Sequence, residues 1–345
     1  MTGLERVISA VKGTVPDRPA VSMTLSLYGA KMINAPLKEY YTQASLYAEG
    51  QQAVRETFDA DILFTPFSLA SIGEVFGSQI AFFDYQPPNM AVPGCKSAQQ
   101  VVDLAKNPMI QEKSVHYHVE ATGFMKKDNN NTAAIGGVFL SPVDLPTMAM
   151  GMEGWLNTLL FQEREANLIL ESMIPFFVNS ANALFQAGVH IMVLPLAFCN
   201  PHIVTRRMVE KIMIPVLKEA FQQLQGPVVL HHVGLPLSPF LELLNNLPNV
   251  VGYALDSTDS FSNARQTLGK APVLLGNIDG PTLYRHSQDD IMNLCHRIYE
   301  NRKNDSHFIL ATSGADIPLQ TPKENIHALV KSAAFYGTEH IHETE

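Results

Sequence analysis

Reactive or polar side chains follow several apolar runs of this chain, each at the point where a buried strand would end. His231 and His232 close the run that begins at Pro227, and a turn at Gly234 follows directly. Other runs end in side chains that could carry protons, ligate a metal or bind a substrate: Cys199, Asn200, Asp256, Asn277, Asp279, Ser313 and Asp316. Because parallel α/β folds place their chemistry where strands end, this pattern predicts an enzyme.

The two histidines should point in opposite directions, since successive side chains of a strand alternate between its faces. We expect His231 to face the interior, as a metal ligand or a general acid or base, and His232 to be a hydrogen-bonded core residue. A satisfied core histidine is also the alternative reading of His231. Asp256 is the acid expected to act on or hold a substrate, whereas Asp279 is better explained by an Asx turn with Gly280.

The elements that would position these residues alternate along the chain. Eight beta-like runs are separated by amphipathic helical patterns; the runs are 19–24, 61–65, 133–140, 189–197, 227–231, 250–255, 272–275 and 308–311. The helical patterns include 37–58 and 205–224. This rhythm predicts a (β/α)₈ TIM barrel formed by the whole chain, 1–345, as one domain. Residues 67–131 are too long for one βα unit and are expected to be an insertion after the second strand.

Composition narrows the class further. The chain of 345 residues has 46% hydrophobic and 17% charged residues and a formal net charge of −9, which argues against disorder and against nucleic-acid binding. We expect no membrane span and no secretion signal. The three cysteines do not suggest a disulfide framework, so a cytoplasmic enzyme is expected.

Several short segments, taken in order, resemble the uroporphyrinogen decarboxylase superfamily, and especially its corrinoid-dependent methyltransferases of the methylcobalamin:coenzyme M type. The matching segments are 4–7, 16–19, 58–61, 72–77, 136–139, 277–279 and 321–326. The similarity spans nearly the whole chain. It implies a TIM barrel whose site lies at the carboxyl-end mouth.

In the methyltransferase branch, zinc converts a thiol into a thiolate, which takes a methyl group from a corrinoid on a separate protein. The zinc motif is His-x-Cys after the fifth strand and a distant cysteine before the last helix. His231 matches the histidine, but Val233 replaces the first cysteine, and no cysteine stands around Gly314. The resemblance leaves zinc open. Cys199, His231, Glu74 and Asp256 could form a rewired metal site, or Cys199 could be a buried thiol without a role.

The resemblance also bears on the other site residues. Glu74 matches an acidic residue that faces the mouth in the methyltransferases, although a helix-start carboxylate is an equal reading. Met148 aligns with the decarboxylase's active-site tyrosine, and residues 22–29 lack that enzyme's arginines. The residues expected to contact substrate are Met148, Asn200, Asn277, Asp279, Ser313 and Asp316.

The predicted function is methyl transfer between a methylcobalamin-type corrinoid on a partner protein and a small molecule such as a thiol, tetrahydrofolate or a methoxylated compound. His231, Glu74 and Asp256 would be its catalytic residues. Two alternatives stay open: a metal-independent carboxy-lyase, and a non-catalytic barrel that binds a ligand or a corrinoid protein. The resemblance leaves a homodimer open, because decarboxylases of this superfamily often pair mouth to mouth, whereas the methyltransferases need that face open for their corrinoid partner.

Overall fold

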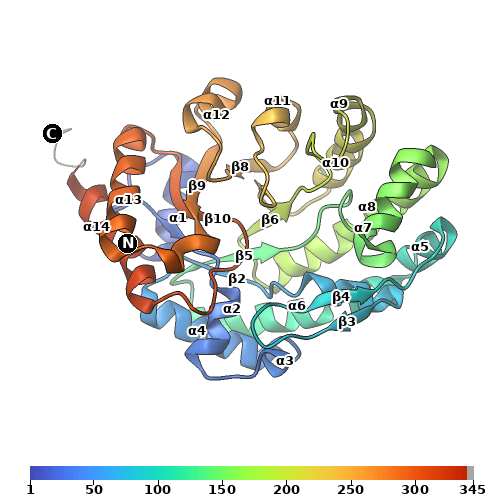
Figure 1. Cartoon of the computed structure of the whole chain (residues 1–345), viewed down its shortest axis with the longest axis horizontal. Helices are drawn as coiled ribbons and strands as arrows, with labels where there is room; N and C mark the ends of the chain where they lie inside the picture. Colours follow the sequence, from blue (N-terminus) through green and yellow to red (C-terminus); the bar gives the residue numbers. More distant parts are fainter. Residues whose placement is uncertain (340–345) are drawn as a thin grey trace.

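Eight parallel strands form the wall of a nearly closed barrel (Figure 1). In this computed structural model, which describes residues 1–339, the wall strands are β1 (Val21–Ser22), β2 (Ile62–Phe64), β5 (Ala134–Val138), β6 (Ile191–Pro195), β7 (Val228–His231), β8 (Val250–Ala254), β9 (Val273–Asp279) and β10 (Phe308–Ser313). Their order around the wall is β1-β10-β9-β8-β7-β6-β5-β2. The predicted (β/α)₈ barrel is therefore confirmed, and each predicted run falls on one strand, although β9 and β10 continue past the predicted ends at 275 and 311.

The seam of the barrel lies between β1 and β2. Within residues 1–339 no backbone ladder joins these two strands, which stand at opposite ends of the strand order. A side chain spans the gap instead: Asp61, which precedes β2, accepts a hydrogen bond at Oδ2 from the Val21 amide at 2.8 Å. Its carbonyl accepts from the Ala134 amide at 2.8 Å, so one residue connects β1, β2 and β5.

Helices surround the wall, and one closes its amino end. They are α1 (Gly3–Lys12), α2 (Ser26–Met32), α3 (Leu37–Tyr40), α4 (Ala44–Phe58), α7 (Pro146–Phe161), α8 (Glu163–Ala187), α9 (Arg206–Met208), α10 (Ile214–Phe221), α11 (Leu241–Leu244), α12 (Phe261–Leu268), α13 (Gln288–Arg302) and α14 (Lys323–Glu339). Short 3-10 segments η3 (Ser238–Phe240) and η4 (Gly280–Arg285) precede α11 and α13. Thr2 caps α1 in a capping box with Glu5, which fixes where this closing helix begins.

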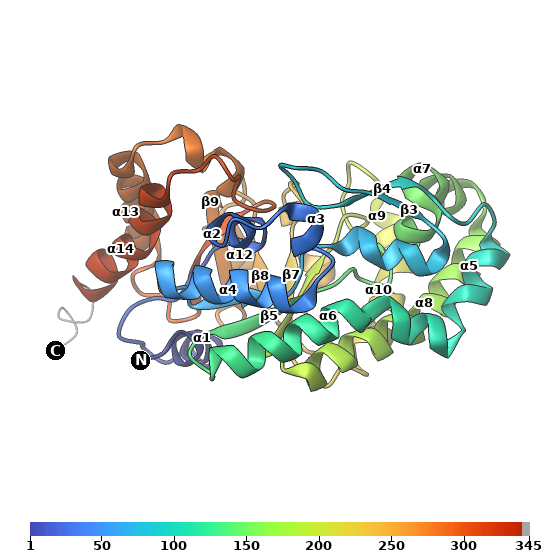
Figure 2. The same cartoon turned by 90° about the horizontal axis from the view of Figure 1, so that it is seen from below.

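The segment between β2 and β5 contains more than one connecting helix. It holds η1 (Leu69–Phe76), the antiparallel pair β3 (Gln79–Ala81) and β4 (Asn89–Val92), α5 (Ala98–Ala105) and α6 (Pro108–Asn129). Helices α6 and α8 lie side by side and extend the molecule beyond the barrel (Figure 2). Helix α6 has Lys126 and Lys127 in its last turn, where cations interact favourably with the helix dipole.

Two predicted helices are interrupted in the structure. The pattern over 37–58 forms α3 and α4 with a turn between them, and the pattern over 205–224 passes from α9 through a π turn, η2 (Val209–Met213), into α10. Pro215 lies two residues beyond that π turn and has no amide to donate to residue 211, which explains the wider turn.

Helix α8 is long and apolar enough to span a membrane by length and composition, whereas the sequence pattern predicted no membrane span. In the structure 61% of its most apolar window is buried, as expected of a helix that packs in a protein core.

Apolar residues form two separate clusters. The larger one lies between the strands and the surrounding helices. The smaller one lies inside the barrel and joins α1 to the inner faces of the strands, with members such as Val7, Ile62, Val193, Val229, Leu275 and Ile309. The inner cluster forms the floor and walls of the site described next.

Candidate functional site at the barrel mouth

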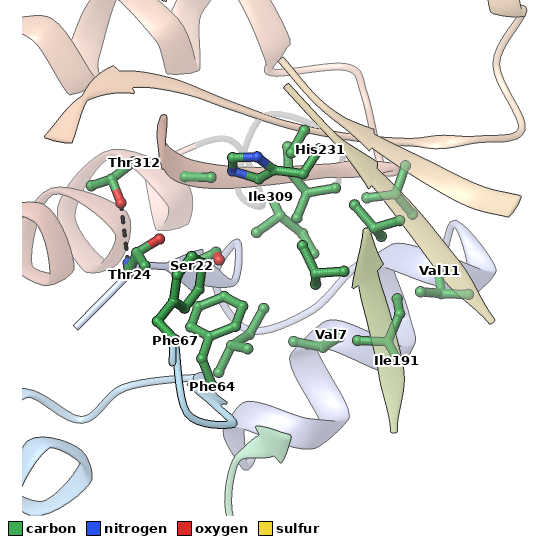
Figure 3. Close-up of a pocket in the computed structure, with 17 residues that line it drawn as sticks. Val7, Val11, Ser22, Thr24, Phe64, Phe67, Ile191, His231, Ile309 and Thr312 are labelled. Atoms are coloured by element: carbon green, nitrogen blue, oxygen red, sulfur yellow. Dashed lines mark hydrogen bonds between the residues drawn. The ribbon is translucent and has the colours of Figure 1, made fainter. Parts of the chain in front are cut away.

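The interior of the barrel is partly hollow. A largely enclosed cavity with a volume of about 40 Å³ runs from α1 toward the carboxyl-end mouth (Figure 3). Val7 and Val11 of α1 line its floor, and aliphatic side chains of the strands line its walls. Ser22, Thr24, Thr312 and His231 are its polar residues. This cavity is where the strand ends meet.

His231 is the last residue of β7, and its ring faces this cavity, as predicted from strand alternation (Figure 3). Burial, reinforced by the neighbouring imidazole of His232, lowers the pKa of His231 to about 3. The ring is therefore neutral at physiological pH and keeps a free lone pair that can accept a hydrogen bond or bind a metal.

His232 is fully buried and connects three loops of the mouth. Its ring stacks on His231 with centroids 4.6 Å apart. The Gly314 amide donates to its Nε2 at 2.9 Å, and Asp256 Oδ2 lies 3.2 Å from its Nδ1. Because a neutral imidazole carries one proton and a carboxylate only accepts, we assign that proton to Nδ1, although the Gly234 amide also lies 3.0 Å away. His232 is thus a structural link between the ends of β7, β8 and β10.

Asp256 follows β8 and holds the shape of its own loop. Its Oδ1 accepts from the Thr258 amide at 2.9 Å and from the Thr258 hydroxyl at 2.6 Å. Burial raises the pKa of Asp256, but the Thr258 hydrogen bonds outweigh it, so the pKa lies below its usual value. The carboxylate is ionised at neutral pH and reaches His231 only through His232.

Two asparagines predicted to contact substrate tie loops of the mouth together. The Asn277 amide group donates to the carbonyls of Asp256 and Asp259, at 3.1 and 3.0 Å. The Asn200 amide group donates to the Pro236 carbonyl at 3.1 Å. Both side chains therefore help to position the mouth, and their contact with substrate stays a prediction.

Asp279 ends β9 and accepts from the Thr282 hydroxyl at 2.8 Å, which is a local turn contact like the one the sequence suggested. Ser313, the last residue of β10, is buried. Met148 lies half-buried on α7, where its carbonyl accepts from the Ser78 hydroxyl at 2.7 Å. Glu74 lies on η1 with its side chain exposed. Neither Met148 nor Glu74 is among the described residues that line the cavity.

Asp316 is the buried acid with unused hydrogen-bonding capacity. Its Oδ1 accepts from the Leu27 amide at 2.8 Å, whereas its Oδ2 is buried without a hydrogen-bond partner among the described residues. Burial raises the pKa of Asp316 to about 7, and the backbone amides of Ser26 and Leu27 offset only part of this. The adjoining Ile317 amide donates to the carbonyl of Thr24, a cavity-lining residue, so the Asp316 loop borders the mouth.

Cys199 is buried after β6, next to the strand of His231 in the barrel order. Burial raises the pKa of its thiol, and the nearby Asp144 raises it further. Asp144 itself accepts hydrogen bonds from Ser141 and from the amides of Ala197 and Phe198. Cys199 is therefore a protonated thiol, which is a poor metal ligand.

The zinc site implied by the resemblance does not fit the donors present. Position 233 is a valine with 39% of its surface exposed, and the Gly314 position offers only a backbone amide. Within residues 1–339 no three His, Cys, Asp or Glu side chains are arranged to hold a metal ion. His231 alone cannot provide the three or four ligands that selective zinc sites use.

Sequence reasoning missed the hydroxyl groups of the cavity. Thr24 and Thr312 face each other from the ends of the first and last strands, and the Thr24 amide donates to Thr312 Oγ1 at 3.2 Å (Figure 3). Both threonines stand at strand ends, and this position was the available signal. The inward direction of Thr24 could not be predicted, because β1 has only two residues and shows no alternation.

Comparisons with known proteins agree with this architecture. The family model of uroporphyrinogen decarboxylase matches residues 2–336, so the chain belongs to the uroporphyrinogen decarboxylase family. A methyltransferase from Methanosarcina mazei has a similar structure, with a TM-score of 0.86 at 19% identity over 97% of this chain and 99% of that one. A B12-independent methionine synthase from Shewanella sp. W3-18-1 matches with a TM-score of 0.54 at 14% identity, over 89% of this chain and 90% of that one. No curated protein matches the sequence. At these identities the two structures support the fold.

Proposed function

We propose that this chain is a methyltransferase that moves a methyl group between a corrinoid, such as methylcobalamin on a partner protein, and a small acceptor or donor. One observation carries the proposal. Among the described residues that line the cavity, the neutral imidazole of His231 is the single titratable group, and the remaining walls are apolar or hydroxylic. Membership of this enzyme family and the whole-length likeness to a methyltransferase support the same reading.

The cavity suits the chemistry of an uncharged methyl group. A bound methylcorrinoid would supply the methyl group and keep the electron pair of the broken bond, and the acceptor heteroatom would give up its proton. An apolar wall excludes water from the reacting atoms. The neutral His231 ring would accept a hydrogen bond from the O–H or S–H of the acceptor and hold its lone pair toward the mouth. With a pKa of about 3 the ring orients the acceptor, and the proton leaves to water at the mouth.

The other groups of the mouth would act by positioning. Asp256 fixes the tautomer of His232, and the stacked His232 ring fixes the plane of His231. Such support is what keeps a reacting group within a fraction of an ångström of its working geometry.

A carboxy-lyase acting on a tetrapyrrole is the less favoured alternative. A substrate with several carboxylates needs guanidinium or ammonium partners. None of the described residues that line the cavity carries a positive side chain. A non-catalytic binding barrel is the remaining alternative.

The test is methyl transfer by the purified chain. Anaerobic protein is mixed with methylcobalamin and, separately, ethanethiol, tetrahydrofolate or a methoxylated phenol, and absorbance spectra follow demethylation of the corrinoid. We expect turnover, and His231→Ala should lower kcat/KM by roughly 10²-fold or more. His116→Ala, an exposed histidine on α6, is the matched control and should keep full activity.

Circular dichroism should show that both variants are folded. An unimpaired His231→Ala would contradict the role of the ring. Coproporphyrinogen formed from uroporphyrinogen would establish the carboxy-lyase instead, and no turnover with any substrate would favour the binding barrel.

A further inference from the structure

We propose that the hollow interior of the barrel, below His231, binds a small uncharged apolar group of about two to four heavy atoms. Its one hydrogen-bonding atom would point at the mouth. The use of this ligand rests on the proposed function. The class of molecule that the site accepts is a short alkyl alcohol, thiol or ether.

Two short side chains leave space inside the barrel. TIM barrels usually fill their interior with layers of bulky branched side chains. Here Ala254 of β8 and Ala311 of β10 stand among larger aliphatic residues at cavity-lining positions. Helix α1 then closes the floor with Val7 and Val11, which makes a chamber instead of a packed core.

The lining selects against charge. Its walls are aliphatic or aromatic, with members such as Ile62, Phe64, Ile191, Val193, Val229, Val273, Leu275 and Ile309. A carboxylate, sulfonate or ammonium group placed there would lose its hydration without gaining a partner of opposite charge, which costs several kcal/mol. An alkyl group loses nothing and gains the burial of its own surface.

The polar groups gather at one end and define the orientation of the ligand. Thr312 Oγ1 accepts from the Thr24 amide, which leaves its hydroxyl proton free to donate. His231, Ser22 and Thr24 complete this end (Figure 3). A ligand hydroxyl or thiol would therefore meet both donors and acceptors here, while its alkyl end points toward α1.

The volume sets the size of the ligand. One water needs about 10–15 Å³ of such space, so the 40 Å³ available holds a group of only a few heavy atoms. An apolar cavity of about 150 Å³ is the size that accepts benzene. We therefore expect short alkyl chains to fit and aromatic rings to be refused.

The test uses a homologous series of alcohols on the whole protein. Ethanol, 1-propanol and 1-hexanol are titrated separately, and the methyl NMR signals of Ile191 and Ile309 are followed. Ile169, buried on α8 outside the cavity, is the internal control. We expect saturable shifts at Ile191 and Ile309, with affinity rising about four-fold from ethanol to 1-propanol and no further gain for 1-hexanol. Propionate and propylamine should give no saturable shift.

Filling the cavity should abolish this binding. Ala311→Val and Ala254→Leu each add apolar atoms to the wall, and 1-propanol affinity should fall at least ten-fold in each folded variant. Ala91→Leu, on the exposed face of β4, should bind like the parent. If Ala254→Leu does not fold, Ala311→Val decides.

Three results would overturn the proposal: no saturable binding, binding unchanged in Ala311→Val, or equal binding of propionate. Alcohol binding without methyl transfer would support this binding site and contradict the proposed function. Methyl transfer without alcohol binding would support the proposed function and contradict this binding site.

Discussion

The two ends of the barrel use their polar residues in opposite ways. At the amino end, Asp61 forms ion pairs with Arg6 and Arg18, with nitrogen–oxygen distances of 3.0 and 2.6 Å. Arg6 also pairs with Asp17, and Arg18 with Asp59. At the mouth, by contrast, Asp316 keeps a buried oxygen without a partner and His231 is held neutral. The charges of the amino-end cluster are all paired, whereas Asp316 at the mouth is a buried acid with one oxygen left over among the described residues.

This difference bears on the sequence segments that resemble the family. The motif segments 4–7, 16–19 and 58–61 contain all five charged residues of the amino-end cluster. The hydrogen bonds from Arg6 hold the pKa of Asp17 well below its usual range, so the cluster stays charged. These three segments therefore report how the barrel is closed. Residues that stabilise the barrel and residues that form its site can be separated in this way because they lie at opposite ends of the strands.

The largest expected effect is at the amino end. Asp61→Asn leaves two buried arginines without their shared charge and should lower the free energy of unfolding by roughly 3–5 kcal/mol. Urea denaturation followed by circular dichroism measures it. Asp59→Asn, where 74% of the side chain is exposed, is the control and should change little. A decrease of less than 1 kcal/mol in the free energy of unfolding of Asp61→Asn would contradict the proposed difference between the two ends.

The next effect should be at Asp316 and should depend on pH. Its folded pKa, about 7, is above the usual 3.8, so between these values the folded state holds a proton that the unfolded state has released. Stability contributed by this residue therefore falls as pH rises from about 4 to 7. Asp316→Asn should remove this fall and gain roughly 2–4 kcal/mol on the parent between pH 4 and pH 8.

Urea midpoints at several pH values would measure this difference, with Asp128→Asn, an exposed acid, as control. A constant offset between Asp316→Asn and the parent would show that the mouth is as well satisfied as the amino end.

A smaller effect is expected at Asp256. Its negative charge raises the pKa of His232 against the lowering effect of burial, so Asp256→Asn should lower that pKa further. Loss of the charged hydrogen bonds should also cost about 1–2 kcal/mol. Histidine ring NMR across a pH titration measures the first effect and denaturation the second. A higher His232 pKa in Asp256→Asn would refute the proposed contact.

The smallest effect should be on the surface. Glu242 pairs with Arg206, and both side chains are about half exposed. Glu242→Gln should leave the urea midpoint within experimental error, because solvent screens such pairs. A clear loss of stability would mean that exposed charge contributes as much as the buried cluster.

Local patterns in the sequence were enough for the architecture. The alternation of apolar runs and helices depends on residues a few positions apart. These patterns predicted eight strands and the inward direction of His231. They did not predict the break between α3 and α4, which no residue pattern in 37–58 marks.

The sequence by itself therefore determined the barrel, its family and the end at which the strands present their side chains. Only the tertiary structure decided which of those side chains meet. The Leu27 amide and Asp316 are 289 positions apart, and Gly314 and His232 are 82 apart, yet each pair forms a hydrogen bond. The hollow interior depends likewise on how α1 and all the strands pack together. Such contacts form only when the barrel closes, because no local rule couples residues so distant along the chain.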